Sequence, residues 1–261
     1  MNQEIPNHLR EQLSSTAFTK VRLRTYLALD VPTWAQAESL VDLFGDAVSG
    51  YKVGLELFYG DGPTAMRELW RRGKRIFLDI KLHDIPNTVA GAIRAVCTPG
   101  VEMVNVHTAG GRNMLEAARE AVDGLTTPPL LIGVTVLTSL DEKLWQELGL
   151  NDLSDTVLHM AKLCAQCGLD GVVTAATEVP RIRAVTSAHF LTVVPGIRPL
   201  GTAKEDQARS LTPEQALRLG ADRLVLGRAV TRAADKQWAL ASIWKEMNEV
   251  LQIQGDGHSN P

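Results

Sequence analysis

The chain has 261 residues, of which 45% are hydrophobic and 22% charged, with 27 lysines and arginines against 30 aspartates and glutamates. This composition is typical of a globular protein with a large core, and it excludes a disordered chain, a collagen-like fibre and a membrane protein. The formal net charge of −3 gives no electrostatic reason to expect nucleic acid or acidic lipid as a partner, so any anion site must be local.

The cysteines and the N-terminal sequence indicate a cellular compartment. Only Cys97, Cys164 and Cys167 occur, too few and too odd in number for a secreted disulfide framework, which favours a reducing compartment. The first 20 residues lack an apolar segment behind a basic start, and no stretch approaches about 18 uninterrupted apolar residues. We therefore expect a cytoplasmic protein that is neither exported nor anchored.

Short β-branched runs alternate with longer amphipathic stretches through nearly the whole chain, as in repeated βα units on a parallel sheet. The expected strands are residues 25–31, 50–55, 75–82, 102–108, 130–137, 170–175, 190–196 and 222–227. The last helix, between Lys236 and Leu251, places its apolar residues on one face.

Eight such units in about 250 residues predict a single-domain (β/α)8 barrel over residues 25–252. An open doubly wound sheet is the alternative, but no linker marks the second domain that it would need. Residues 1–24 and 253–261 carry few apolar side chains, and we expect a peripheral N-terminal extension and a flexible C-terminal tail.

Charged residues interrupt the apolar pattern of the first three strands. Because side chains alternate along a strand, Asp79 and Lys81 share the inward face with Phe77, while Ile76, Leu78, Ile80 and Leu82 face the helices. The same alternation turns Asp30 and Lys52 inward, with Leu27, Leu29, Val31, Tyr51, Val53 and Leu55 outward. Two aspartates and two lysines therefore converge on the C-terminal mouth, where barrel active sites lie.

Four interior charges are a poor way to stabilise a fold, because removing an ion from water costs several kcal/mol. A functional role is the better explanation. Opposite charges held close together keep the lysines protonated and the carboxylates ionised, which suits a site where a lysine donates a proton.

A second set of residues follows the seventh and eighth strands. Residues 193–211 form a long glycine- and proline-containing loop, after which Thr212 and Pro213 begin a helix. Gly227 and Arg228 follow the eighth strand and precede a helical turn. Barrels often bind phosphate at this place, through a helix N-terminus and a charge-assisted contact such as Arg228 offers.

Motifs along nearly the whole chain resemble those of the orotidine 5'-phosphate decarboxylase family. They are ALD ending at Asp30, YKVGLELF from Tyr51, FLDIKLHDIPNTV from Phe77, GVTVLTSL from Gly133, VVPGIRP from Val193, EDQAR around Gln207 and LVLGRAVTRA from Leu224. D-x-K-x-x-D alone is shared with related sugar-phosphate decarboxylases, whereas the additional I-P-N-T, VPGIRP and GR motifs make the resemblance specific. Residues 201–205 depart from the family pattern.

The resemblance implies decarboxylation of orotidine 5'-monophosphate to UMP and CO2, the last step of de novo UMP synthesis, without metal or cofactor. Asp30 and Lys52 would hold the ribose hydroxyls, Asp79 would lie beside the substrate carboxylate, and Lys81 would protonate C6. Asp84, Ile85 and Thr88 would reach the neighbouring site of a homodimer, with Asp84 joining the catalytic group. Thr138 and Ser139 would contact the pyrimidine, Pro195 the base pocket, and Arg198, Gln207, Gly227 and Arg228 the phosphate.

Two other functions compete with this one. A metal-dependent sugar-phosphate decarboxylase or epimerase would need carboxylate and histidine ligands, which lysines at the mouth disfavour. A non-catalytic UMP sensor would share the phosphate loop but has no use for Asp79 and Lys81 together.

Two cysteines and two histidines have either a functional or a purely structural role. Cys164 and Cys167 form a C-x-x-C with no second pair, so buried packing is the better interpretation than a redox or zinc site. His107 faces inward with Asn105 and either lines the base pocket or is structural. His83 has no clear role.

Overall fold

The computed structural model describes residues 16–150, 152–198 and 211–256. Eight parallel strands pair in sequence order, and β1 also pairs with β8, so the sheet closes into a barrel. The strands are β1 Thr25–Ala28, β2 Gly50–Gly54, β3 Arg75–Leu82, β4 Val101–His107, β5 Leu130–Val134, β6 Gly171–Val173, β7 Leu191–Val194 and β8 Arg223–Leu226. The predicted (β/α)8 barrel is confirmed, and the open sheet is wrong.

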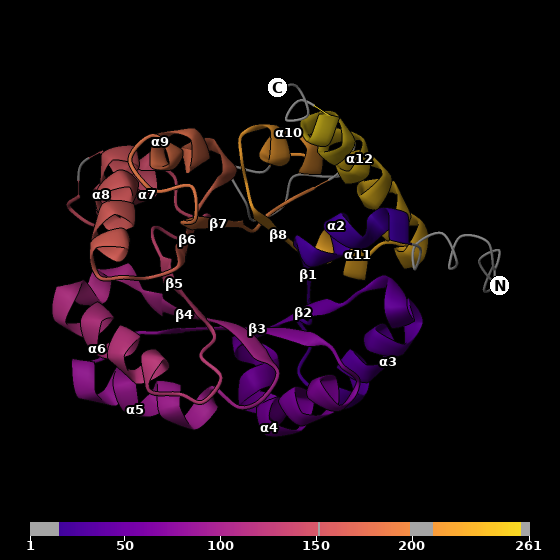
Figure 1. Ribbon diagram of the computed structural model, residues 1–261, viewed down its shortest axis with the longest axis horizontal. Helices are drawn as coiled ribbons and strands as arrows, with labels where there is room; N and C mark the ends of the chain where they lie inside the picture. Colours follow the sequence, from indigo (N-terminus) through magenta and orange to yellow (C-terminus); the bar gives the residue numbers. More distant parts are fainter. Residues whose placement is uncertain (1–15, 151, 199–210, 257–261) are drawn as a thin grey trace.

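Helices surround this barrel, most of them in the connections between strands, with α2 before β1 and α11 and α12 after β8 (Figure 1). They are α2 Thr19–Leu23, α3 Trp34–Phe44, α4 Leu55–Arg71, α5 Pro86–Val96, α6 Gly111–Asp123, α7 Glu142–Glu147, α8 Leu153–Gln166, α9 Val179–Arg183, α10 Pro213–Arg218, α11 Arg228–Thr231 and α12 Lys236–Asp256. Four 3₁₀ turns accompany them: η1 Thr16–Phe18, η2 Gly45–Ala47, η3 Thr108–Gly110 and η4 Ala176–Glu178. No helix in the described parts of the chain is both long enough and apolar enough to cross a membrane.

Strand alternation separates two apolar layers, as the sequence predicts. The interior of the barrel is filled by Tyr26, Ala28, Phe77, Met103, Ile132, Val193 and Val225, whereas Leu27, Leu29, Tyr51, Val53, Ile76, Leu78 and Ile80 pack outward on the helices. Leu55 is the exception, because β2 ends at Gly54 and Leu55 begins α4 with 42% of its surface exposed.

The N-terminal end of the barrel is closed by a polar cluster. The Tyr26 hydroxyl donates to Glu102 Oε2 at 2.5 Å, and Arg75 Nη1 donates to the same oxygen at 2.8 Å. The Arg75 guanidinium also lies over the Tyr26 ring, 5.1 Å from its centroid. Burial and the Glu102 carboxylate raise the pKa of Tyr26, so this hydroxyl keeps its proton and its hydrogen bond. In the described residues, this leaves the C-terminal end of the barrel for a site.

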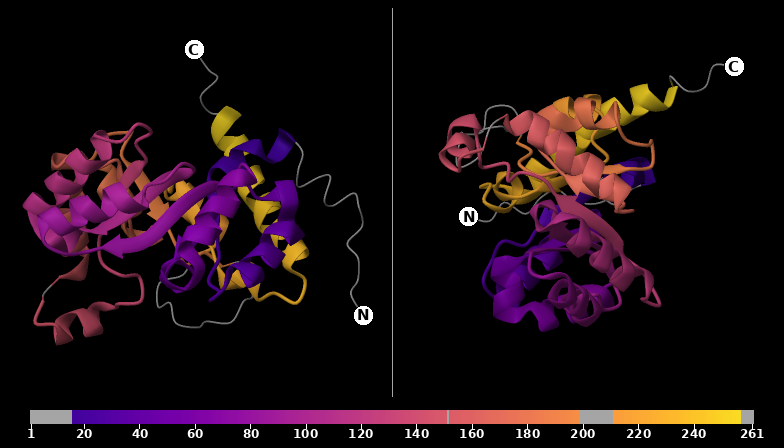
Figure 2. Two further views of the ribbon diagram at one scale, coloured as in Figure 1. Left: turned by 90° about the horizontal axis from the view of Figure 1, so that it is seen from below. Right: turned by 90° about the vertical axis from the view of Figure 1, so that its left-hand side faces the viewer.

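Connections at that end differ in length. The α10 helix begins where predicted, since Thr212 accepts from the Gln215 N–H and the Gln215 side chain accepts from the Thr212 N–H. The connection from β5 to β6 carries α7, which projects from the body of the barrel (Figure 2).

The first and last described helices, α2 and α12, pack against each other. Val21 of α2 is fully buried, and the Phe18 ring lies 6.0 Å from the ring of Trp244 in α12. Residues 1–15 and 257–261, which belong to the expected extension and tail, lie outside the described residues.

Trp244→Ala tests how far α12 stabilises the barrel. Trp244 is fully buried on the helix that packs against α2, α10 and α11, so its truncation is expected to lower the free energy of unfolding by about 3–5 kcal/mol in urea titrations. Trp238, on the same helix, is 63% exposed, and Trp238→Ala is the matched control with a change below about 0.5 kcal/mol. Equal effects of the two substitutions would contradict this account.

Candidate active site

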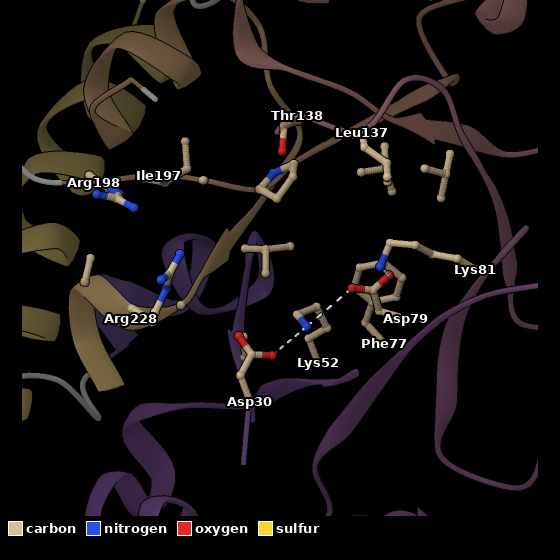
Figure 3. A pocket seen from close by; sticks show the side chains of 18 of the residues that line it. Asp30, Lys52, Phe77, Asp79, Lys81, Leu137, Thr138, Ile197, Arg198 and Arg228 are labelled. Carbon is tan, nitrogen blue, oxygen red and sulfur yellow. Dashed lines mark hydrogen bonds and ion pairs between the residues drawn. The ribbon is translucent and has the colours of Figure 1, made fainter. Parts of the chain in front are cut away.

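Three strands bring four charged side chains into one line at the C-terminal mouth (Figure 3). Lys52 Nζ lies 3.0 Å from Asp30 Oδ1 and 3.3 Å from Asp79 Oδ2, and Lys81 Nζ lies 2.6 Å from Asp79 Oδ1. Asp30 lies two residues after the end of β1, Lys52 belongs to β2, and the other two belong to β3. The charges alternate in sign along the line, so each inner group has an opposite charge on both sides.

Burial and charge act against each other on the two inner groups. Burial alone lowers the pKa of Lys52, but the Asp79 and Asp30 carboxylates outweigh it and raise that pKa above its ordinary value. Burial alone raises the pKa of Asp79, but the Lys52 and Lys81 ammonium groups, helped by Asn105, lower it below the ordinary value. Lys52 is therefore cationic and Asp79 anionic at neutral pH, as expected from the sequence.

The backbone of β3 is irregular where it presents these groups. Lys81 has φ = +48°, a left-handed conformation that costs a residue with a side chain roughly 1–2 kcal/mol. The Lys81 N–H donates to Asn105 Oδ1 at 2.8 Å, and Asn105 Nδ2 donates to Asp79 Oδ1 at 2.7 Å. Strain of this kind persists only where neighbouring groups hold it.

A cavity of about 260 Å³ opens beside the charged line. One end is formed by Lys52, Asp79 and Lys81, and the middle is lined by apolar side chains, namely Phe77, Val134, Val136, Leu137, Val173, Pro195, Ile197 and Val225. At the other end, Arg198 and Arg228 point their guanidinium groups toward the same space (Figure 3). An elongated ligand with an anionic group at the far end fits this distribution.

The structure brings most of the sequence-predicted residues to this cavity. Those that line it are Asp30, Lys52, Asp79, Lys81, Thr138, Pro195, Arg198, Gly227 and Arg228. Ser139, Asp84, Ile85 and Thr88 are exposed and do not line it. Gln207 and residues 201–205 lie outside the described residues.

Two glycines give the site room. A Cβ at Gly227 would lie 3.9 Å from Asp30 Oδ2, so the open backbone at the Arg228 end faces the charged line. A Cβ at Gly54 would lie only 2.9 Å from Lys52 Nζ. Our sequence reasoning missed Gly54, although strand alternation places it on the inward face with Lys52.

His83, His107 and the C-x-x-C cysteines do not line the cavity. The His107 and His83 rings are 5.4 Å apart, and neither residue lines the cavity, so His107 does not form the base pocket. Burial, with the neighbouring His83 and Lys81, lowers the pKa of His107.

All three cysteines are free. Burial raises the pKa of Cys164 to about 12, and its Sγ lies 3.1 Å from Thr108 Oγ1, which fits the packing role. Across residues 16–150, 152–198 and 211–256, no group of three His, Cys, Asp or Glu side chains is arranged to hold a metal ion.

The fold and the site together define a class: a (β/α)8-barrel enzyme that acts on a small anionic substrate at its C-terminal mouth. Residues 24–243 match the family described as Orotidine 5'-phosphate decarboxylase / HUMPS, and the chain belongs to this family.

Individual relatives agree with the family match. The chain is 45% identical over 250 residues to the orotidine 5'-phosphate decarboxylase of Moorella thermoacetica, with 93% of this chain and 98% of the relative covered. It is 46% identical over 228 residues to that of Nitrosococcus oceani, with 87% and 98% covered. The crystal structure of the Lactobacillus acidophilus enzyme superposes with a TM-score of 0.74 at 33% identity, covering 86% of this chain and 98% of that one.

Gly54→Ala tests whether the position of the Lys52 ammonium matters. The new methyl group would displace Nζ from Asp30 and Asp79, and turnover of the substrate proposed below is expected to fall about tenfold or more, with little change in melting temperature. The control is Gly124→Ala, where the added Cβ meets only ordinary contacts at 3.5 and 3.7 Å. Unchanged turnover in Gly54→Ala would show that the ammonium position is not critical.

Proposed function

We propose that the protein decarboxylates orotidine 5'-monophosphate to UMP and CO2, the last step of de novo UMP synthesis. The observation that carries this proposal is the alternating line of Asp30, Lys52, Asp79 and Lys81 at one end of a cavity whose other end holds two guanidinium groups. The family name also covers HUMPS, so family membership alone does not choose the activity. The named relatives and the I-P-N-T, VPGIRP and GR motifs favour the decarboxylase.

The cavity accommodates the parts of this nucleotide in order. Arg228, Arg198 and the Gly227 backbone face the phosphate, with Gln207 assigned to the same group by its motif. Asp30 and Lys52 hold the ribose hydroxyls. The apolar middle, with Pro195 and Thr138, receives the flat pyrimidine. Ser139 follows Thr138 in the chain and is assigned to the pyrimidine by its motif. This order leaves C6 and its carboxylate at the Asp79 and Lys81 end.

The reaction breaks the bond between C6 and the carboxylate carbon. CO2 leaves without the bonding electron pair, which stays on C6 as a carbanion that the ring delocalises poorly. The Lys81 ammonium stabilises this charge, because a fixed cation in a site shielded from water acts most strongly on charge that develops during the reaction. Lys81 then donates its proton to C6, forming UMP, and regains a proton from solvent.

Asp79 has two tasks in this scheme. Its carboxylate lies beside the departing CO2 group, and its ion pairs with Lys52 and Lys81 fix both ammonium groups. The scheme uses only groups of the protein and calls for no metal or cofactor.

The phosphate lies far from C6, and its binding energy still contributes to the rate. Contacts with Arg228 and Arg198 hold the nucleotide so that C6 meets Lys81, and binding energy from a remote group is used to orient the reacting one. Loss of these contacts therefore affects turnover as well as affinity.

We further propose a homodimer in which each cavity is completed by its neighbour. Asp84, Ile85 and Thr88 lie at the start of α5, exposed and outside the cavity of their own chain, and Ile85 exposes 68% of its surface. An apolar side chain beside a carboxylate at the mouth of the barrel suits contact with a second copy. Asp84 would then extend the line of charges of the neighbouring site.

The cellular location follows from the same proposal. Three free cysteines, two of them buried, fit a reducing compartment, and we assign the protein to the cytoplasm.

Lys81→Ala tests the assigned reaction. The wild-type protein is expected to convert orotidine 5'-monophosphate to UMP in the presence of chelator, followed by ultraviolet absorbance, whereas the variant loses turnover and still binds UMP. Activity that disappears with chelator would favour the metal-dependent sugar-phosphate enzyme, and UMP binding without turnover in the wild type would favour the sensor.

Mixing two inactive variants tests the shared site. If Asp84 serves the neighbouring cavity, dimers of Lys81→Ala with Asp84→Ala contain one intact site, and random exchange restores about a quarter of the wild-type activity. If Asp84 serves its own chain, no combination of the two variants has an intact site and the mixture stays inactive. Each variant alone is the control.

A further inference from the structure

We propose that Asn105 is the positioning residue of this site: its side-chain amide holds the Lys81 backbone and the Asp79 carboxylate in the one arrangement that aims the Lys81 ammonium into the cavity. The inference deepens the proposed function and rests on it for the reaction that is measured. Asn105 belongs to β4, is fully buried, and does not line the cavity.

The strand register shows why such a residue is needed. Leu78 pairs with Val104 and Leu82 with Val106, so three residues of β3 lie opposite the single residue Asn105 of β4. The extra length of β3 forms a bulge, and the ordinary ladder of backbone hydrogen bonds is interrupted there. Lys81, with φ = +48°, lies within the bulge.

The Asn105 amide replaces the interrupted bonds. Its Oδ1 accepts from the Lys81 N–H at 2.8 Å, which gives a partly buried backbone donor the partner that the ladder does not supply. Its Nδ2 donates to Asp79 Oδ1 at 2.7 Å, the same oxygen that accepts from Lys81 Nζ at 2.6 Å. One amide thus connects the main chain of Lys81 to the carboxylate that holds its side chain.

The chemistry of the two partners explains why the residue is an asparagine. The Lys81 N–H requires an acceptor and the Asp79 carboxylate requires a donor, and these demands fix the orientation of the amide. An aspartate of the same shape would keep the acceptor but turn a second carboxylate oxygen toward Asp79. An alanine would leave both partners without this contact.

The two carboxylate oxygens of Asp79 have different partners. Lys52 from β2 lies on Oδ2, whereas Lys81 and Asn105 share Oδ1. His107, from the same strand as Asn105, is a further titratable group close enough to interact with Asp79. Asn105 is therefore the neutral group that selects the orientation of the carboxylate without changing the charge of the site.

The experiment compares Asn105→Ala and Asn105→Asp with the wild type on orotidine 5'-monophosphate. Asn105 positions the reacting groups and does not contact the substrate. We therefore expect kcat to fall on the order of 100-fold, with KM and UMP affinity nearly unchanged. The matched control is Thr174→Val, which changes another fully buried polar side chain whose hydroxyl has no hydrogen-bond partner among the described residues. This control should keep its kcat.

A pH profile separates positioning from a loss of stability. In Asn105→Asp, the lost donor and the added carboxylate raise the pKa of Asp79, so the acid limb of kcat should move to higher pH. A residue that only stabilises the fold would not move this limb.

Crystal structures of the two variants complete the test independently of substrate. We expect Lys81 to leave the left-handed conformation in Asn105→Ala and its Nζ to move away from Asp79. Unchanged Lys81 geometry, an unchanged kcat, or an effect confined to KM would overturn the proposal. If the wild type itself does not convert orotidine 5'-monophosphate, the proposed function fails, while the Lys81 conformation in the variants still decides the role of Asn105.

Discussion

The ion pairs that Asp79 makes with Lys52 and Lys81 place three charges within contact distance at the end of a barrel whose middle layer is apolar. Asp79 and Lys52 offset the cost of burial for each other, since burial alone raises the pKa of the Asp79 carboxyl and lowers that of the Lys52 ammonium. The surrounding structure serves this balance: β2 and β3 lie side by side, Gly54 leaves space for Lys52, and the bulge of β3 turns Lys81 toward Asp79.

The strand pattern alone predicted much of this arrangement. A period of two residues places Phe77, Asp79 and Lys81 on the inner face of β3, and the structure confirms this placement. The pattern is reliable because a shift of one residue would turn the outward apolar side chains away from the helices. The predicted strands 130–137 and 190–196 extend beyond β5 and β7, whose ladders end at Val134 and Val194. The prediction is too long because the residues after these two strands are also apolar. They belong to loops, and several of them line the cavity.

The remaining features depend on contacts that a sequence pattern does not contain. Nothing in the alternation of β3 signals that Lys81 adopts a positive φ, because the cause lies in its pairing with β4, twenty-four residues later in the chain. Asn105 could be placed on the inner face, but its two partners could not. Asp84, Ile85 and Thr88 were assigned from the family resemblance alone. Their side chains are exposed and do not line the cavity of their own chain, so the strand pattern does not indicate them.

The closed N-terminal end of the barrel has a consequence for traffic through the site. Tyr26, Arg75 and Glu102 seal that end, and the layer containing Phe77 and Met103 fills the space above them. In the described part of the chain, this packing leaves the C-terminal mouth as the route for the nucleotide, the CO2 released from it and the replacement proton. Any segment that covers the opening controls entry and exit together, so tight closure over the substrate carries an inherent delay in product release.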